Sequence, residues 1–412
     1  MQESFIKLHQ TVICLFKDGI TFDGQRGSGT IELYYMKILI LSCNTGEGHN
    51  SSAKALQSTM LKRGLECDVQ DTIALISPAV SRKVSDVYVY STGNTLFEKA
   101  YKIGAVVSDI NSPSIKSPVY MTNKLYAEKL YRYIIDNQYD AVICVHLFPA
   151  EAITALKRNG VLHLPAIFVM TDYTCIPFLT ETELDSYVIP HEDLIEEFVE
   201  KGIPREKIVP VGIPVNEEKF AARIPAGQAR KQINAEFAWD DADGRWFLLM
   251  GGSMGFGNMN GLISALQSQL NDNDRVICIC GRNEDILSSI REEFAEDSRI
   301  KAVGFTDKVS VLMDASDVLF TKPGGITSTE AIIKNIPLIH TAPIPGLEDR
   351  NARFFHFHNM SYSSPDPKQQ AAVALRLCED AAYRKRMLDA QNRNSNHRTC
   401  DTITDLVLSY GK

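Results

Sequence analysis

Short apolar runs alternate with amphipathic stretches along most of this 412-residue chain. Each run ends in a polar or glycine-containing turn, and apolar residues between the runs recur at helical spacing, for example at Ala53, Leu56 and Met60. Strands that alternate with helices predict parallel sheets with helices on both faces. The predicted strands form a first series at 38–43, 141–145, 166–170 and 186–190 and a second series at 246–250, 275–280, 300–303, 318–321 and 337–341.

The two series predict two doubly wound α/β domains, each beginning with a strand that runs into a glycine-rich loop. The stretch IPVNEEKF at 213–220 is interpreted as the linker between them. Met36 directly precedes the first strong strand, so we hypothesise that translation starts there; the alternative is that the residues before it form a mobile arm. The predicted parts are an extension at 1–35, a first domain at 36–215, a second domain at 216–395 and a helical tail at 396–412.

Composition and charge exclude several classes of protein. The chain carries 43 Lys and Arg against 51 Asp and Glu, a net charge of −8, which argues against a general nucleic-acid binder. Its apolar runs are too short for a membrane-spanning helix or for a signal peptide, so we expect neither. The nine cysteines lack CxxC spacing and are typical of reduced thiols in a cytosolic protein.

The segment 78–135 differs from the rest of the chain in charge. It holds eight Lys or Arg, four Asp or Glu and seven of the 15 tyrosines. Basic residues interleaved with aromatic rings suit an anionic membrane surface, where the charges attract and the rings anchor. The alternative is an ordinary helical insertion with a solvated charged face.

The first candidate motif is SCNTGEGHN at 42–50, where the first strand ends. Gly46 and Gly48 permit a tight turn at the sheet edge where ligands bind, and Asn50 belongs to the same loop. His49 begins the next helix, whose dipole lowers the imidazole pKa, so a neutral His49 can act as a general base. The alternative is a helix-capping side chain. The motif is neither GxGxxG nor a P-loop, which weakens dinucleotide and ATP interpretations.

The second motif, MGGSMG at 250–255, has two interpretations. It matches the GxSxG nucleophile elbow of serine hydrolases, with Ser253 as the nucleophile. It also suits a loop whose backbone N–H groups, around Gly252, Ser253 and Met254, bind a pyrophosphate. We favour the phosphate loop because a complete α/β domain precedes the motif and no HGGG-like segment is present. The hydrolase triad would need Asp314 or Asp317 and His340 or His356.

The third motif, TKPGGITSTE at 321–330, again joins a strand to a helix through glycines. In one interpretation Thr327 caps the helix and Glu330 closes a capping box. In the other, the helix start at Gly325 and Thr327 faces phosphate, and the Glu330 carboxylate accepts two sugar hydroxyls.

The fourth motif, PIPGLEDRN at 343–351, contributes Glu348 and Asp349 as acceptors for sugar hydroxyls, or as solvated charges. No cluster of His, Cys and Asp has zinc or calcium spacing, so we expect no metal site. The two Asp-x-Asp pairs, at 241–243 and 272–274, precede strands and are interpreted as solvated turns.

The ordered motifs together resemble one family. The stretches 37–57 and 321–355 resemble the monogalactosyldiacylglycerol synthase and processive diacylglycerol glucosyltransferase family, and GGSMG (251–255) and VGFT (303–306) match its intervening loops. The peptidoglycan N-acetylglucosaminyltransferase is a more distant relative. The resemblance covers about 36–395 and implies a GT-B fold, in which two Rossmann-like domains face a central cleft. It also implies a UDP-sugar in the C-terminal domain and a lipid acceptor in the N-terminal domain.

The resemblance also implies roles for individual residues. His49 would lie near the acceptor hydroxyl as base or positioning group, and Asp172 is a second acidic candidate. On the donor side, Ser253 and Met254 would contact the diphosphate, Phe305 would border the uracil, Glu330 would hold the ribose, and Glu348 and Asp349 would lie near the sugar.

Two positions depart from the family pattern. Leu347 stands where the family often has Gln, which leaves the donor sugar open, and Glu47 stands where it has Gly. Glu47 adds a negative charge near an anionic ligand, or it tunes His49.

We therefore predict an inverting, metal-independent glycosyltransferase that moves a hexose from a UDP-sugar to diacylglycerol or a glycolipid. It would need no cofactor and would act in the cytoplasm, peripherally at the inner face of the cell membrane, with no nucleic-acid partner. The alternatives are a UDP-sugar epimerase of the same fold, a serine hydrolase using Ser253, and a non-catalytic UDP-sugar-binding regulator.

Overall fold

The structure is a computed structural model that describes residues 36–43, 47–76, 118–124, 126–240, 243–252, 258–341, 343 and 346–411. Residues Met36–Lys412 form one compact unit that contains two six-stranded sheets. The predicted extension at 1–35 lies outside the described residues.

The first sheet consists of parallel strands in the order β2-β1-β3-β4-β5-β6. The strands are β1 (Lys37–Ser42), β2 (Glu66–Asp71), β3 (Ala141–Cys144), β4 (Ala166–Val169), β5 (Ser186–Ile189) and β6 (Ile208–Pro210). The accompanying helices are α2 (Glu47–Lys62), α3 (Thr72–Ile76), α6 (Pro118–Lys124), α7 (Ala127–Asp136), α8 (Leu147–Arg158), α9 (Ile195–Lys201) and α19 (Thr399–Ser409), with short 3-10 turns η1 (Leu179–Glu181), η2 (Glu192–Leu194) and η3 (Arg205–Lys207).

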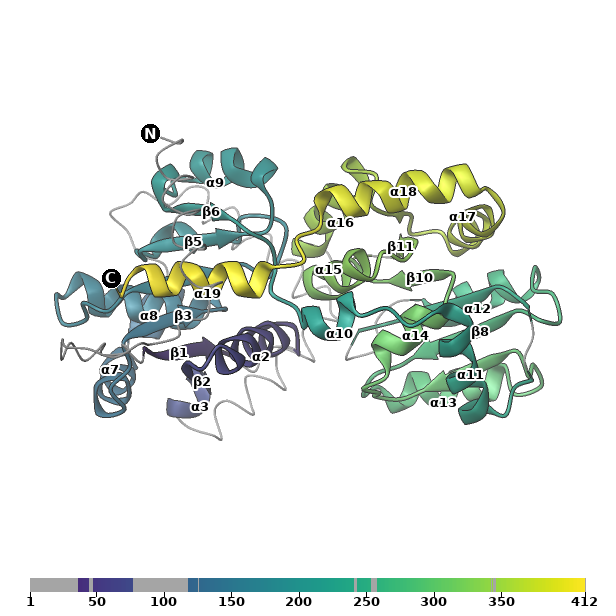
Figure 1. Ribbon diagram of the computed structural model, residues 1–412, viewed down its shortest axis with the longest axis horizontal. Helices are drawn as coiled ribbons and strands as arrows, with labels where there is room; N and C mark the ends of the chain where they lie inside the picture. The colour runs from purple at the N-terminus through teal and green to yellow at the C-terminus, as the bar shows by residue number, and fades with distance from the viewer. Residues whose placement is uncertain are drawn as a thin grey trace, which may run out of the picture. The chain divides into compact units, whose positions relative to one another are not determined.

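Side chains of β1 alternate between two buried clusters. Leu39 and Leu41 pack with residues of α6, α7 and α8, whereas Ile38 and Ile40 pack with residues of α2 and α19. Helices therefore bury both faces of the sheet, as the continuous apolar runs predict (Figure 1). The C-terminal helix α19 returns to this sheet and lies against α2.

The second sheet is also parallel, in the order β12-β11-β10-β7-β8-β9. Its strands are β7 (Trp246–Met250), β8 (Arg275–Ile279), β9 (Ile300–Val303), β10 (Val318–Thr321), β11 (Leu338–His340) and β12 (Tyr362–Ser363). Its helices are α10 (Glu217–Ala221), α11 (Ala226–Phe237), α12 (Met259–Gln267), α13 (Glu284–Glu293), α14 (Val309–Ala315), α15 (Gly325–Lys334), α16 (Leu347–Phe357), α17 (Pro367–Glu379) and α18 (Ala381–Asn394).

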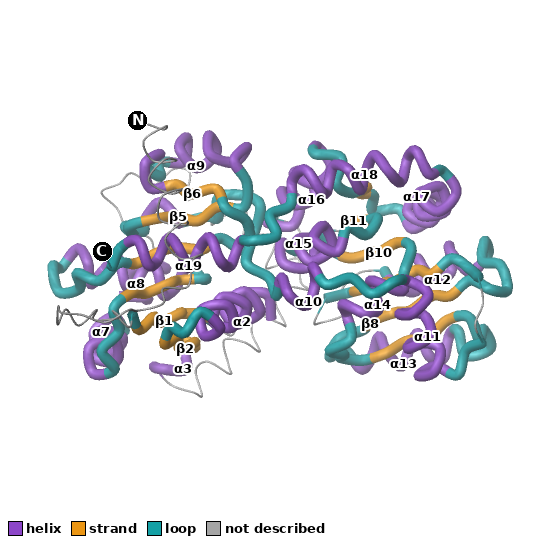
Figure 2. The backbone as a smooth tube through the Cα atoms, viewed as in Figure 1, coloured by secondary structure: helices purple, strands orange, loops and turns teal. Residues whose placement is uncertain are grey.

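The side chains of β7 divide between the two faces in the same way. Phe247 and Leu249 pack with α12, α13 and α17, and Trp246 and Leu248 pack with α11, α14 and α15. Figure 2 shows the strands of this sheet in orange between purple helices. The two parallel sheets confirm the predicted α/β architecture.

The strands that the pattern missed are β2, β6 and β12, and each lies at an edge of its sheet. An edge strand is less enclosed and so is less apolar: β2 reads ECDVQD, and β6 contains Pro210. The predicted linker at 213–220 contains the start of α10, whose Phe220 is buried.

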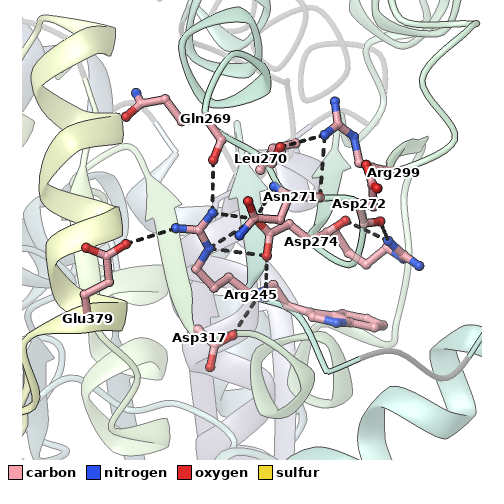
Figure 3. Close-up of polar contacts among 11 residues, drawn as sticks. Arg245, Gln269, Leu270, Asn271, Asp272, Asp274, Arg299, Asp317 and Glu379 are labelled. Carbon is pink, nitrogen blue, oxygen red and sulfur yellow. Dashed lines mark hydrogen bonds and ion pairs between the residues drawn. The ribbon is translucent and has the colours of Figure 1, made fainter.

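In the turn Asp272-Asn273-Asp274, which precedes β8, Asp272 and Asn273 are exposed as predicted, whereas Asp274 is not. The side chain of Asp274 is buried and binds the Arg245 guanidinium, with 2.6 Å between Nη2 and Oδ2. Arg245 also donates to the Gln269 carbonyl and pairs with Glu379 (Figure 3). This turn therefore secures the amino edge of the sheet, opposite the edge where ligands bind.

The basic, tyrosine-rich segment 78–135 is described only from 118 onward, without residue 125. In that part Tyr120 and Tyr126 are buried in the core beside α7 and α8. These two rings do not face a membrane, which corrects that part of the prediction. Among the described helices, none combines the length and the hydrophobicity that crossing a bilayer requires.

Candidate functional site

Both sheets reverse their strand order at one position, and ligands of doubly wound sheets bind beside such a position. In the first sheet the reversal lies at β1 and β3, and the loops that follow these strands lead to His49 and His146. In the second sheet it lies at β7 and β10, which are followed by Gly251 and Lys322. The first, second and third motifs therefore lie at the two switch points.

His49 lies in the first turn of α2 with its ring half-buried. Its Nδ1 is 2.8 Å from the Val145 carbonyl oxygen. Since a carbonyl only accepts, Nδ1 carries the proton and donates it, and Nε2 keeps its lone pair. Burial lowers the pKa of His49 below 6.5, although the Asp172 charge and the Val145 hydrogen bond act in the opposite direction. The ring is therefore neutral near pH 7, as predicted, with burial as the main cause.

His146 is a site residue that the sequence analysis missed. Its Nδ1 accepts a hydrogen bond from the Phe148 N–H, 3.1 Å away, and so caps α8. Its ring meets the His49 ring edge to face, with 4.7 Å between centroids. Burial holds the pKa of His146 well below 6.5, and a proton on His49 would lower it further. The sequence feature that could have identified His146 is its position directly after a predicted buried strand.

The loop after β4 connects His49 to the start of α15. Thr171 Oγ1 lies 3.2 Å from His49 Nδ1. A Cβ built on Gly325 would stand 2.0 Å from the Thr171 carbonyl oxygen, so α15 begins in backbone contact with this loop. The next residue, Asp172, accepts a hydrogen bond at Oδ1 from Asn351 Nδ2, 2.8 Å away.

Asn351 is a second residue that the sequence analysis missed as a site residue. It lies in α16, fully buried. Its Nδ2 also donates to the Pro323 carbonyl at 2.9 Å, and its Oδ1 accepts from the Tyr173 N–H at 2.7 Å. Asn351 thus ties the loop after β4, the loop after β10 and α16 together. The sequence indicated Asn351 only weakly, because it is a single amide at the end of an acidic motif.

Gly48 and Asn50, in the first turns of α2, lie against neighbouring elements. A Cβ on Gly48 would lie 3.2 Å from Cγ1 of Ile326 in α15, so this position also favours a small residue. Asn50 Oδ1 accepts a hydrogen bond from the Ser42 hydroxyl at 2.8 Å. Asn50 therefore anchors the start of α2 to the end of β1. Gly46 lies outside the described residues.

Gly252, two residues after the end of β7, occupies the left-handed region, with φ of +72°. A Cβ there would lie 2.9 Å from Cε of Lys322, so the two switch-point loops of the second sheet touch. Lys322 forms an ion pair with Glu348. Ser253 and Met254 lie outside the described residues.

The acidic motif at the start of α16 is already engaged with protein groups. Glu348 pairs with Lys322, and Asp349 Oδ2 accepts from the Gly346 N–H at 3.0 Å, which caps the helix. If Glu348 and Asp349 bind a sugar as predicted, each carboxylate must either share its present partner with the sugar or give that partner up.

The predicted capping box at Thr327 and Glu330 is wrong. The N-cap of α15 is Gly324, so the helix begins earlier and Thr327 lies inside its first turn. The first-turn N–H groups of a helix have no intrahelical acceptor and favour an anion. Within the described residues the Glu330 carboxyl accepts no hydrogen bond. Burial raises the pKa of Glu330 to about 8, with Lys219 acting in the opposite direction.

Phe305 is 65% exposed, and its ring lies 5.4 Å from the Arg282 guanidinium. Arg282 also pairs with Glu47, with 2.7 Å between Nη2 and Oε1. The charge of Glu47 is therefore balanced by a cation that stacks on Phe305.

Among the described residues, most of the Asp and His candidates for a hydrolase triad are engaged with other groups. Asp314 forms a buried ion pair with Lys334, and Asp317 pairs with Arg230 at the amino end of β10. His340 is held between two serine hydroxyls, and burial lowers its pKa to about 3. His356 is exposed on α16.

The geometry supports a specific type of chemistry. A neutral His49 with a basic Nε2 can accept a proton from a hydroxyl. The start of α15, in contact with the loop beside His49, can stabilise an anionic leaving group.

Comparison with known families and relatives gives consistent matches along the chain. A family model described as monogalactosyldiacylglycerol (MGDG) synthase matches residues 49–215, and one described as the glycosyltransferase family 28 C-terminal domain matches residues 247–372. A processive diacylglycerol β-glucosyltransferase of Bacillus mycoides is 26% identical over 90% of this chain and 93% of its own length. The Bacillus subtilis enzyme of that name is 27% identical over 77% of this chain and 81% of its own length.

Solved structures agree on the fold. MurG of Acinetobacter baumannii superposes with a TM-score of 0.58 at 12% identity, over 91% of this chain and 99% of its own. The UDP-GlcNAc 2-epimerase of Neisseria meningitidis, bound to UDP-GlcNAc, gives 0.60 at 13%, over 91% and 100%. These neighbours show the GT-B fold. With family matches on both halves, the chain is similar to the monogalactosyldiacylglycerol synthase and processive diacylglycerol glucosyltransferase family.

Proposed function

We propose that the chain transfers a hexose from a UDP-sugar to the hydroxyl of a membrane lipid, either diacylglycerol or a glycolipid. The names of its relatives, processive diacylglycerol β-glucosyltransferases, support a lipid acceptor. Solved neighbours in complex with UDP or a UDP-sugar support a nucleotide-sugar donor. The proposal includes an inverting reaction without a metal ion or cofactor, at the cytoplasmic surface of a membrane.

The observation that carries the proposal is the orientation of His49. Its Nδ1 proton is used by the Val145 carbonyl, so Nε2 is the atom that can accept a proton. Its lowered pKa keeps Nε2 unprotonated near neutral pH, which a general base requires. In the proposed step Nε2 takes the proton of the lipid hydroxyl while that oxygen attacks the anomeric carbon and the bond to UDP breaks.

The negative charge shifts onto the diphosphate as that bond breaks. The first-turn N–H groups of α15 and the Lys322 ammonium lie at the switch point of the second sheet and are suited to stabilise it. Lys322 pairs with Glu348, so we propose that Glu348 holds Lys322 in place for the phosphate. Glu330, six residues into α15, supports ribose binding.

The test uses the full chain with vesicles that contain diacylglycerol. Radiolabelled UDP-glucose, UDP-galactose and UDP-GlcNAc are supplied one at a time, and the lipids are extracted and separated. A labelled glycolipid from one donor supports the proposal, and a parallel reaction in a chelator tests metal independence. A His49→Asn variant is the matched control, because asparagine keeps an N–H for the Val145 carbonyl and lacks the base.

The rival functions give different products in the same experiment. An epimerase converts the donor when no lipid is present. A regulator binds UDP-sugar and leaves all the label in the donor with every acceptor. Either result would replace the proposed transfer reaction.

A further inference from the structure

The histidine at the end of α16, His358, has an unusual pair of neighbours. Its Nδ1 lies 2.8 Å from the Phe354 carbonyl oxygen, and its Nε2 lies 2.8 Å from Asp193 Oδ2. Both oxygens are acceptors when Asp193 is ionised, so a neutral imidazole with one proton cannot satisfy both contacts. A second proton or a metal ion is required at Nε2.

A second imidazole converges on the same carboxylate. His191 Nδ1 lies 3.6 Å from Asp193 Oδ2, and the two histidine rings are 5.2 Å apart at 65°. His191 Nδ1 accepts a hydrogen bond from the Asp193 N–H at 3.2 Å, so its lone pair is directed at the Asp193 backbone and must leave that bond to bind an ion. The pKa of His191 is lowered by burial, and the groups that face it are Asp193, His358, Glu192 and Asn394.

We propose that His191, Asp193 and His358 bind a divalent transition-metal ion of the Zn²⁺ class. Their three ligand atoms lie within 4.8 Å of one another. Ligands about 2.0–2.1 Å from a tetrahedral zinc ion are separated by roughly 3.3 Å, so shifts of less than about 1.5 Å complete the site. Two imidazoles and one carboxylate form a common zinc set, with water in the remaining position.

The surroundings of the cluster fit a metal site. The Nδ1–H of His358 donates to a backbone carbonyl, which is the usual way in which a zinc-bound histidine is oriented. The Phe354 ring packs against both imidazoles, at 4.1 Å from His358 and 5.3 Å from His191. The Asp193 side chain is 59% exposed, so an ion and its water can reach its carboxylate from solvent.

The ion would join two regions that are distant in sequence. His191 and Asp193 follow β5 of the first sheet, and His358 ends α16 beside the second sheet. Binding therefore restrains the loop after β5 against α16. The ion takes the place of the Nε2 proton of His358. It also replaces the hydrogen bond that the Asp193 N–H donates to His191, and water can then accept from that N–H at this exposed position. The cluster is separate from His49, so this inference is independent of the proposed function.

The experiment titrates Zn²⁺ into chelator-treated, dialysed full-length protein by calorimetry. We expect one ion per chain, and affinity at least about tenfold lower in His358→Ala and in Asp193→Asn. His356→Ala is the control, because it removes an exposed histidine from the same helix and leaves the affinity unchanged. Because histidine must lose its proton to bind a metal ion, binding also weakens as the pH is lowered.

Co²⁺ absorption identifies the ligands, since His and Asp ligation lacks the thiolate charge-transfer band that a cysteine site would show. Thermal unfolding without metal checks that each variant is folded, and Asp193→Asn, at an exposed side chain, preserves the test if His358→Ala does not fold. Failure of the wild-type chain to bind Zn²⁺, unchanged affinity in the folded variants, or a thiolate band would each overturn the proposal.

Discussion

Replacing Gly325 with alanine sets two physical effects of opposite sign against each other. Gly325 is the first residue of α15, and its φ lies outside the left-handed region, so alanine suits its backbone conformation. Helix propensity alone predicts that alanine stabilises the protein by up to about 1 kcal/mol. The contact with the loop after β4 predicts the reverse.

The size of the clash follows from the built Cβ position. That atom would stand 2.0 Å from the Thr171 carbonyl oxygen and 3.2 Å from the Asp172 Cα. An ordinary carbon–oxygen contact is about 3.3 Å, so roughly 1.3 Å of overlap must be relieved by backbone movement. Overpacking of this kind costs about 1–3 kcal/mol, and we expect a net loss of about 1–2 kcal/mol after the propensity gain.

Urea unfolding of Gly325→Ala and of a matched control measures this difference. Gly227, in the first turn of α11, has no atom within 4 Å of its built Cβ, so Gly227→Ala should gain about 0.5–1 kcal/mol. A Gly325→Ala protein as stable as Gly227→Ala would refute the backbone contact. Because Thr171 also touches His49, we expect kcat of Gly325→Ala to fall by about 10²-fold.

Three further variants test single contacts. Burial keeps the Glu330 carboxyl protonated between pH 4.5 and about 8, whereas ribose hydroxyls bind better to the ionised carboxylate. The affinity for UDP, measured by calorimetry, should therefore rise with pH across this range. A pH dependence of this affinity that persists in Glu330→Gln would contradict the prediction. Asp314→Ala leaves the buried Lys334 unpaired and should cost about 3–5 kcal/mol in urea unfolding; a loss below about 1 kcal/mol would show that the pair does not matter. Asp349→Ala removes the acceptor for the Gly346 N–H and should cost about 0.5–2 kcal/mol; a raised donor KM without any loss of stability would instead assign Asp349 to the sugar.

The architecture was predictable from the sequence because its central strands are buried on both faces and are continuously apolar, as in β1 and β7. The edge strands β2, β6 and β12 were missed; β2, for example, mixes charged and apolar residues in a way that a loop also can. Both switch points could be found from the glycine-rich loops that follow the strands. Ligands of doubly wound sheets bind beside such loops, so a local sequence pattern indicates a position in the sheet.

Partnerships between distant residues were out of reach of the sequence. Nothing local indicates that Gly325 packs on Thr171, or that Lys322 binds Glu348 and so occupies a carboxylate that the motif offered to a sugar. The capping box failed because Gly324, with no side chain to signal it, is the N-cap of α15. His191 and His358 do not form a metal-binding sequence motif, because they are 167 residues apart and come together only in the folded chain.

The most direct measurement compares the rate of sugar transfer to lipid by the wild-type chain and by His49→Asn across pH. Asparagine retains an N–H for the Val145 carbonyl and removes Nε2, so the unfolding free energy should change little. With Nε2 as the base, kcat falls by about 10²–10⁴-fold and the donor KM is nearly unchanged. The acidic limb of the wild-type profile should lie below pH 6.5, in line with the lowered pKa of His49, and should disappear in the variant. A His49→Asn enzyme that retains kcat within a few fold, with the same acidic limb, would contradict the assignment of His49 as the base.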